Sequence, residues 1–192
     1  MPTAIKIPPV VSYPTMGTSL PGSPVDGQQA ILVDSTSSPT YAWMFQYLAS
    51  ASKWLFIGGS PAITEVATAE FTNSTTYVDL TTVGPSFTIP RTGQYEIAFA
   101  FNQYGQNIPG GAAVKLGSAA TSVNEGFSSG AGANGAGAGN AISSATRVGG
   151  SKMFSRALNA GDVLKVQYLV EIGASGNTFA NRTLSVRPIW VT

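Results

Sequence analysis

Residues 94–104 read Gln-Tyr-Glu-Ile-Ala-Phe-Ala-Phe-Asn-Gln-Tyr, and this stretch decides the fold class. Large apolar side chains occupy every second position from Tyr95 to Phe101, and smaller or polar residues fall between them. A period of two is typical of a strand that buries one face and exposes the other. Residues 163–168 alternate in the same way. Both segments therefore predict half-buried β-strands.

The sequence on either side of these two segments, residues 62–192, predicts a series of strands separated by turns rich in Gly, Pro and Asn. Helical periodicity is almost absent from this part of the chain. Many short strands of this kind are the signature of a β-sandwich or jelly roll. The predicted strands are Glu65–Thr72, Thr76–Thr82, Ser86–Ile89, Gln94–Tyr104, Ala112–Leu116, Thr146–Leu158, Val163–Ile172 and Thr183–Val191.

Residues 25–61 predict a small β module placed before the sandwich. Gly27–Val33 and Lys53–Ile57 are expected to flank a central strand, Tyr41–Tyr47, whose aromatic residues lie at every second position. A helix through 41–52 is the alternative, because Ala, Met, Gln and Leu permit one. We expect the aromatic face to form the core of the module, and a sugar-stacking platform is the less favoured interpretation.

Residues 1–24 contain six prolines and predict an extended arm. The arm lacks the continuous apolar segment and cleavage site of a secretory signal. It nevertheless carries more apolar side chains than a plain linker needs, so we expect it to lie along a surface, its own or a partner's. The apolar residues, which are our candidates for attachment, are Ile5, Ile7, Val10, Val11, Tyr13 and Leu20.

Residues 126–140 are a Gly/Ala-rich stretch that cannot supply core side chains, and they predict a long loop. Within this loop, Gly130–Gly135 matches the dinucleotide-binding fingerprint letter for letter. That fingerprint functions only between a strand and a helix, with an acidic residue about 20 positions later. No helix is predicted after the glycines, so we interpret the match as a coincidence.

The amino-acid composition excludes many kinds of catalytic and metal-binding site. Of 192 residues, 10% are charged and none is His or Cys, against about 25% charged residues in ordinary domains. No disulfide, thiolate nucleophile, imidazole base, or His- or Cys-ligated metal can therefore form. The net charge of +1 argues against an electrostatic nucleic-acid binder, and no apolar stretch is long enough for a membrane-spanning helix.

The charged residues are dispersed along the chain. The nine acids occur singly, and no calcium-binding series of alternating Asp residues is present. Two acids could still converge in space, so a glycan-degrading enzyme remains a distant third hypothesis. The closest basic residues, Arg147, Lys152 and Arg156, are expected to lie on a solvated sheet surface. We predict a protein that is not an enzyme and binds no cofactor or metal.

Two sets of motifs resemble proteins of tailed-bacteriophage virions. The first set comprises Leu20–Gln29, Trp43–Tyr47 and Lys53–Pro61, which contain the patterns P-x-D-G-Q and K-W-x-F-(V/I)-G-G-x-P. This arrangement resembles a small module that recurs in phage virion proteins. The resemblance implies that residues 25–61 attach the protein to the particle.

The second set comprises Ser86–Ile97, Leu158–Val166 and Leu184–Val191. In these segments an apolar strand ends at Pro, a turn leads to Gly-x-Tyr, and L-x-x-G-D opens a late strand. The pattern resembles the jelly roll of phage fibre and decoration domains, which is similar in shape to the C1q and tumour-necrosis-factor modules. The resemblance implies a homotrimer. A charge-poor chain is also poorly protected against association, which favours an assembly independently.

We therefore expect a virion protein, assembled in the host cytoplasm, in which surfaces carry the function. The leading hypothesis is a trimeric tail-tip or fibre component that attaches to the host surface. The alternative is a capsid decoration or head-fibre protein whose arm grips the shell. Expected partners are other copies, other phage structural proteins and a host-surface glycan or protein. Contact loops are predicted at 104–112, 126–140 and 173–181, with candidate residues Gln106, Asn107, Phe127, Asn134, Asn140, Asn177 and Phe179.

Overall fold

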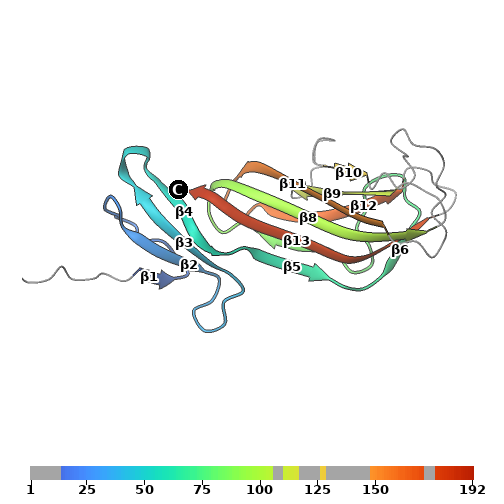
Figure 1. The fold of residues 1–192 in the computed structure, drawn as a ribbon, viewed down its shortest axis with the longest axis horizontal. Helices are drawn as coiled ribbons and strands as arrows, with labels where there is room; N and C mark the ends of the chain where they lie inside the picture. Colours follow the sequence, from blue (N-terminus) through green and yellow to red (C-terminus); the bar gives the residue numbers. More distant parts are fainter. Residues whose placement is uncertain (1–13, 106–109, 117–125, 129–147, 171–175) are drawn as a thin grey trace, which may run out of the picture.

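Two β-sheets make up the structure, which confirms the predicted all-β sandwich (Figure 1). The computed structural model describes residues 14–105, 110–116, 126–128, 148–170 and 176–192. The larger sheet contains β1 (Thr15–Gly17), β2 (Gln29–Val33), β3 (Ala42–Leu48), β4 (Lys53–Ser60), β5 (Ala62–Val66), β6 (Glu70–Thr72), β8 (Gly93–Gly105), β11 (Val148–Leu158) and β13 (Asn177–Val191). The smaller sheet contains β7 (Ser86–Thr88), β9 (Gly110–Leu116), β10 (Gly126–Ser128) and β12 (Val163–Val170).

The sandwich has the strand order of a jelly roll. In the larger sheet β13 pairs with β5, β6 and β8, and β8 pairs with β11. The facing sheet has the order β10-β9-β12-β7. From β6 onward the strands alternate between the two sheets, except that β9 and β10 both lie in the smaller sheet, which is the pattern of a jelly roll.

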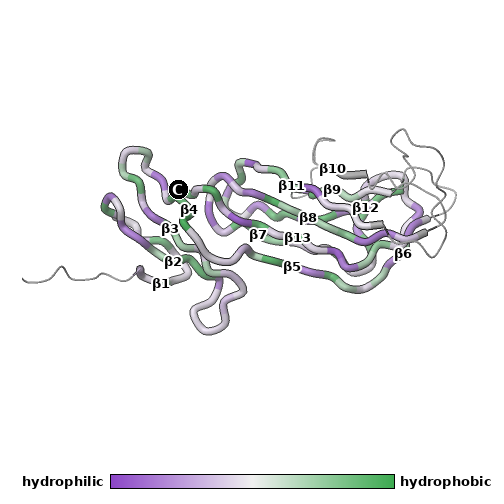
Figure 2. Tube along the Cα trace, in the orientation of Figure 1, coloured by the Kyte–Doolittle hydropathy of each residue, from purple (hydrophilic) through white to green (hydrophobic). Residues whose placement is uncertain are grey.

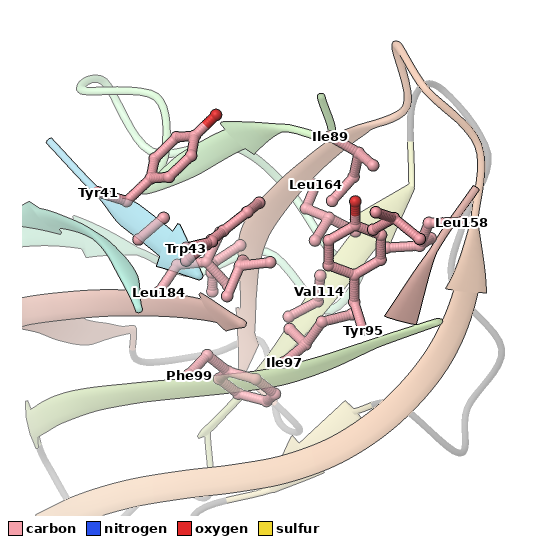
Figure 3. Close-up of a cluster of buried hydrophobic side chains, with 14 of the residues drawn as sticks. Tyr41, Trp43, Ile89, Tyr95, Ile97, Phe99, Val114, Leu158, Leu164 and Leu184 are labelled. Carbon is pink, nitrogen blue, oxygen red and sulfur yellow. The ribbon is translucent and has the colours of Figure 1, made fainter. Parts of the chain in front are cut away.

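Alternating residues of β8 and β12 form the sandwich core, as their period of two predicted. Tyr95, Ile97 and Phe99 of β8 are buried, and so are Leu164 and Val166 of β12. Figure 3 shows side chains from both sheets converging between the layers. The opposite face of β8 points away from the core and carries the smaller or polar residues of the alternation, among them Glu96, Ala98 and Ala100.

The module before the sandwich is a three-stranded meander, and β3 is a strand as predicted, not the alternative helix. Trp43 and Phe45 of β3 are buried together with Trp54 of β4, so the aromatic face is core and not an exposed sugar platform. Tyr41 stacks on Trp43 with ring centroids 4.1 Å apart, and burial raises the pKa of Tyr41 to about 12. Leu20, from the proline-rich segment, is buried in the same core.

The meander and the sandwich are joined through one continuous sheet. β4 pairs with the end of β13, where Leu55 lies opposite Trp190 and Trp54 lies opposite Val191. The same buried cluster extends from Trp43 into the sandwich (Figure 3). The two predicted units therefore share a sheet and a core. At the start of the described chain, β1 extends this sheet by pairing in parallel with β2.

Several predicted strand boundaries were wrong. The stretch Glu65–Thr72 contains the two strands β5 and β6, with residues 67–69 between them. The stretch 76–82 is not a strand and makes only an isolated bridge from Val78 to Tyr168. At the end of that stretch, Thr82 is held by the carboxylate of Glu70, and its backbone does not join a strand ladder.

Two further corrections concern predicted loops. Residues 126–128, at the start of the predicted Gly/Ala loop, form β10 because their backbone pairs with β9. β13 begins at Asn177, six positions before the predicted start at Thr183, because residues 177–180 pair with both β6 and β8. The remainder of the Gly/Ala loop lies outside the described residues.

Candidate interaction surface

The outward side of the larger sheet carries unusually small and uncharged side chains. Ala98 and Ala100 of β8 lie beside Thr183 and Ser185 of β13 and beside Ser151 of β11. Because these side chains are short, they leave a shallow hollow of about 250 Å³, which Phe99, Lys152 and Met153 also line. We call the five residues with short side chains the hollow face. An antiparallel sheet that faces water on one side normally carries polar side chains there, so the two alanines at these positions favour a surface that a partner covers.

Large apolar side chains stand at both margins of the hollow face. Met153 pairs with Ala98 on one margin, and Ile63 pairs with Ser185 on the other. Beyond the bulge, toward the β6 end of the same side, Phe71 pairs with Thr178. Met153 is 65% exposed, Phe71 63% and Ile63 52%. The face thus combines protruding apolar side chains with a depression lined by small ones. Such a surface can bury apolar area against a partner with complementary protrusions.

This side of the sheet carries charges of both signs, since Glu65 lies opposite Thr183 and Arg187 lies opposite Glu96. Arg187 and Glu96 form an ion pair of 2.7 Å at the end of the hollow face nearest the meander. Both residues line a smaller depression together with Gly59 and Pro61. A paired surface of this kind does not attract a strongly charged ligand.

The inner side of β13 carries a buried polar cluster that the sequence did not reveal. Arg182 is 0% exposed and donates to Glu70 at 2.9 Å, to the carbonyl of Thr82 at 3.3 Å and to that of Thr68 at 3.4 Å. Its guanidinium also lies 5.4 Å from the ring centre of Tyr168. We call Arg182 and Glu70 the buried clamp, because together they fix the segments on either side of β6.

The local backbone explains how an arginine of β13 enters the interior. Asn181 adopts a positive φ of 47°, and the pairing with β8 shifts register between Ala180 and Thr183. A bulge re-aims the side chains next to it, and Asn tolerates the left-handed conformation better than most residues. The outward neighbours of the bulge, Ala180 and Thr183, keep their places on the other face.

The environment of Glu70 favours its charged form. Burial alone would raise the pKa of Glu70, but hydrogen bonds from the backbone and hydroxyl of Thr82, together with the Arg182 cation, outweigh burial and lower it. The same balance applies to Asp79, in the segment that bridges to β12 at Val78. There, hydrogen bonds from Lys165 at 2.7 Å and Gln167 at 3.0 Å overcome burial and lower the pKa of Asp79.

Three of the predicted site residues are buried in the structure. Leu20 is a core residue and is not available for attachment, because it covers the aromatic side of the meander. Asn177 and Phe179 are buried in β13 and are not exposed loop residues, because the strand begins earlier than predicted. Phe179 packs against Phe101 and Tyr168 in the sandwich core.

The other candidates are not tested by the structure. Phe127 lies in β10, and nothing further is described for its side chain. The remaining candidates lie outside the described residues, namely Ile5, Ile7, Val10, Val11, Tyr13, Gln106, Asn107, Asn134 and Asn140. The fingerprint at 130–135 also lies outside them.

Within the described ranges, no group of three or more acidic side chains could hold a metal ion. The same part of the chain contains no helix with the length and apolar character needed to cross a membrane. No family model matches the sequence, and no curated protein matches it.

Proposed function

We propose that this protein is a structural component of a tailed-bacteriophage virion, a homotrimer at the tail tip or in a fibre that contacts the host surface. Copies contact each other through the hollow face, and the part of the chain before the sandwich attaches the trimer to the particle. The hollow face, with its small side chains between exposed apolar residues, carries this proposal, together with the phage-like motifs of the sequence.

The arrangement of the two ends of the molecule supports an attachment end and a contact end. The meander lies at one end, and β6 marks the opposite end (Figure 1). At the β6 end, Asn177 pairs with both Thr72 and Gly105, and the backbone of Val170 donates to Ser74 at 2.8 Å. These strand ends border the predicted contact loops at 104–112 and 173–181. A protein attached through its meander would present these loops outward.

Electrostatics favour self-association over binding to a charged partner. Lys and Arg number 10 and Asp and Glu number 9, so copies repel one another only weakly. Of the acids that a catalytic hypothesis would need, Glu70, Asp79 and Glu96 are each paired with a cation. A surface role therefore fits the described residues better than glycan hydrolysis does.

Localisation in the particle tests the proposed position. Virions of the phage that encodes this chain would be labelled with an antibody against the sandwich and imaged by electron microscopy. We expect the label at the tail tip or on fibres. Label on the shell would overturn the tail assignment in favour of capsid decoration, and purified particles without the chain would overturn the virion role.

Adsorption tests the proposed host contact. Host cells preincubated with saturating purified protein should adsorb fewer phage particles, because the protein would occupy the same surface sites. A folded protein with a disrupted β6 end is the matched control. Unchanged adsorption at saturation would contradict the host-contact role.

A further inference from the structure

Residues 79–84, which we call the latch loop, leave the edge of the smaller sheet and then return to it. Before the loop, Val78 and Tyr168 of β12 exchange two backbone hydrogen bonds of 3.0 Å, and after it the carbonyl of Pro85 accepts from Val166 at 3.0 Å. Within the loop, no backbone group bonds to another backbone group of the described chain. Contacts with side chains therefore hold the latch loop against the sandwich.

The buried clamp holds the latch loop to the larger sheet. One oxygen of the Glu70 carboxylate accepts from the backbone of Thr82 at 2.9 Å and from its hydroxyl at 2.6 Å. Arg182 donates to the other oxygen at 2.9 Å and to the carbonyl of Thr82 at 3.3 Å. The hydroxyl of Tyr168, whose ring centre lies 5.4 Å from the guanidinium, adds a long hydrogen bond of 3.4 Å to the carbonyl of Gly84. The strongest of these bonds all end on Glu70.

A second carboxylate holds the latch loop to the smaller sheet. Asp79 accepts from the ammonium of Lys165 at 2.7 Å and from the side-chain amide of Gln167 at 3.0 Å, and both donors belong to β12. Between the two carboxylate contacts, Leu80 is buried, whereas Val83 is 55% exposed. The latch loop is therefore attached to each sheet through a carboxylate, with one buried apolar side chain between the two attachments.

Both carboxylates neutralise cations that have no other described acid beside them. Figure 2 shows hydrophilic stretches, in purple, near β6. There Arg182 is enclosed and bonds to Glu70. At the other attachment, Lys165 pairs across the strands with Lys115 of β9, and Asp79 lies close enough for both lysines to attract it. Protonation of the carboxyls would leave a buried guanidinium unpaired and two lysines facing each other, and both situations are unfavourable.

We propose that the latch loop is a conformational device that opens in acid, when protonation of Glu70 and Asp79 releases residues 79–84 from both sheets while the sandwich stays folded. The ladders of β8, β11 and β13 are made by backbone groups, which do not titrate, and they continue to hold the fold. Opening exposes Leu80. This inference does not depend on the proposed self-association.

The direction of the pH dependence follows from the two carboxyls. Burial alone would raise the pKa of each, but their hydrogen bonds and the neighbouring cations outweigh burial and lower it. The closed loop is therefore fully stabilised above the ordinary pKa values, about 4.3 for Glu and about 3.9 for Asp. This stabilisation is lost as pH falls through the lower values of the folded state.

Hydrogen exchange of the intact protein, followed by mass spectrometry, tests the inference. Exchange is expressed as protection relative to an unstructured peptide at the same pH, so that it reports the opening equilibrium. We expect the protection of the backbone amide of Thr82 to fall at least tenfold between pH 6 and pH 3, while β8 and β12 keep theirs. Unchanged protection of Thr82, or its loss together with β8 and β12, would overturn the inference.

Variants test the same device at neutral pH. Glu70→Gln and Asp79→Asn imitate the protonated carboxyls, and each should reduce the protection of the latch loop several-fold at pH 7. Glu65→Gln is the matched control, because Glu65 is an exposed acid of β5 outside the loop, and it should change nothing. Asp79 is 33% exposed, so Asp79→Asn keeps the test decisive if Glu70→Gln does not fold. Protection equal to that of the natural protein in a folded variant would overturn the inference.

A concentration series separates the latch loop from association. Native mass spectrometry would define the number of chains at each pH, and exchange would be measured for single and for associated chains. We expect the same loss of protection in both. If acid changed the latch loop only where chains also dissociate, the effect would belong to association and the inference would fail. Single chains at every concentration would overturn the proposed trimer and leave the inference standing.

Discussion

β13 carries an arginine on each of its two sides, and the surroundings of the two residues are opposite. Arg182 is enclosed between the sheets, where it holds Glu70, while Arg187 lies on the outward side, paired with Glu96 and partly exposed. Between them, the outward side presents Thr183 and Ser185. A charge-poor protein has thus placed one of its few ion pairs in the interior and has left small side chains on an open sheet face.

This contrast distinguishes residues that hold the fold from residues that contact a partner. A buried charge must be paired or the fold loses stability, whereas an exposed apolar face costs little in folding but favours association. The two sides of one strand therefore make separable predictions. Changes on the inner side should alter unfolding, and changes on the outer side should alter the number of chains in the assembly.

The largest effect is expected for Arg182→Ala. Removing the guanidinium leaves Glu70 buried without its cation, which should reduce the free energy of unfolding by about 3–5 kcal/mol. Urea denaturation of the dissociated protein measures this loss. The double variant Arg182→Met with Glu70→Met removes both charges and should recover most of it. A loss well below 1 kcal/mol for Arg182→Ala would show that the clamp does not stabilise the fold.

A smaller effect is expected for Leu20→Ala, which tests whether this residue belongs to the core. Truncation of a buried leucine should cost about 2–5 kcal/mol. Val25→Ala is the control, because Val25 lies in the same segment but is 67% exposed, and its truncation should stay within about 0.5 kcal/mol. Thermal or urea unfolding compares the two. If both truncations had equally small effects on stability, Leu20 would be a surface residue and a candidate for attachment, not a core residue.

Acidification should weaken the inner side through Glu70. The pKa of this carboxyl is lowered in the folded state, so the folded state binds its proton less readily than the unfolded state does. The stabilisation is therefore complete above the unfolded pKa of about 4.3 and is lost as pH falls through the lower folded pKa. Glu70→Gln should lose less stability than the natural protein between pH 6 and pH 3. Parallel pH profiles for the two proteins would contradict this assignment.

The smallest effect on stability is expected for Arg187→Met on the outer side. An ion pair that is partly exposed contributes about 0–1 kcal/mol, and salt weakens it. Urea denaturation at low protein concentration, at low and high salt, measures this change without the contribution of association. A loss of stability as large as that caused by Arg182→Ala would contradict the view that only the inner side of β13 stabilises the fold.

Sequence patterns predicted the parts of the fold that local periodicity determines. The alternation of β8 and β12 and the aromatic residues of β3 indicated strands because each buries one regular face. The same periodicity predicted that the aromatic face of β3 belongs to the core.

The remaining features depend on partners that are distant in the sequence. Asn177 has the composition of a turn, but pairing with β6 and β8 makes it part of β13. Arg182 and Glu70 are 112 positions apart, so no local pattern predicts their contact. The hollow face arises because small residues of three strands lie side by side in the sheet. Predicting it would require knowing which strands are neighbours and in what register they pair. A signal was nevertheless present in β8, where alanines occupy the positions that a solvated strand fills with polar residues.

Native mass spectrometry of a variant of the hollow face tests the central claim most directly. Ser185→Arg places a charged side chain in the hollow, and Val163→Arg places the same side chain on the other sheet. At matched concentration we predict three chains for the natural protein and for Val163→Arg, and single folded chains for Ser185→Arg. Single chains for the natural protein, or an unchanged trimer for Ser185→Arg, would contradict the claim that copies associate through this face.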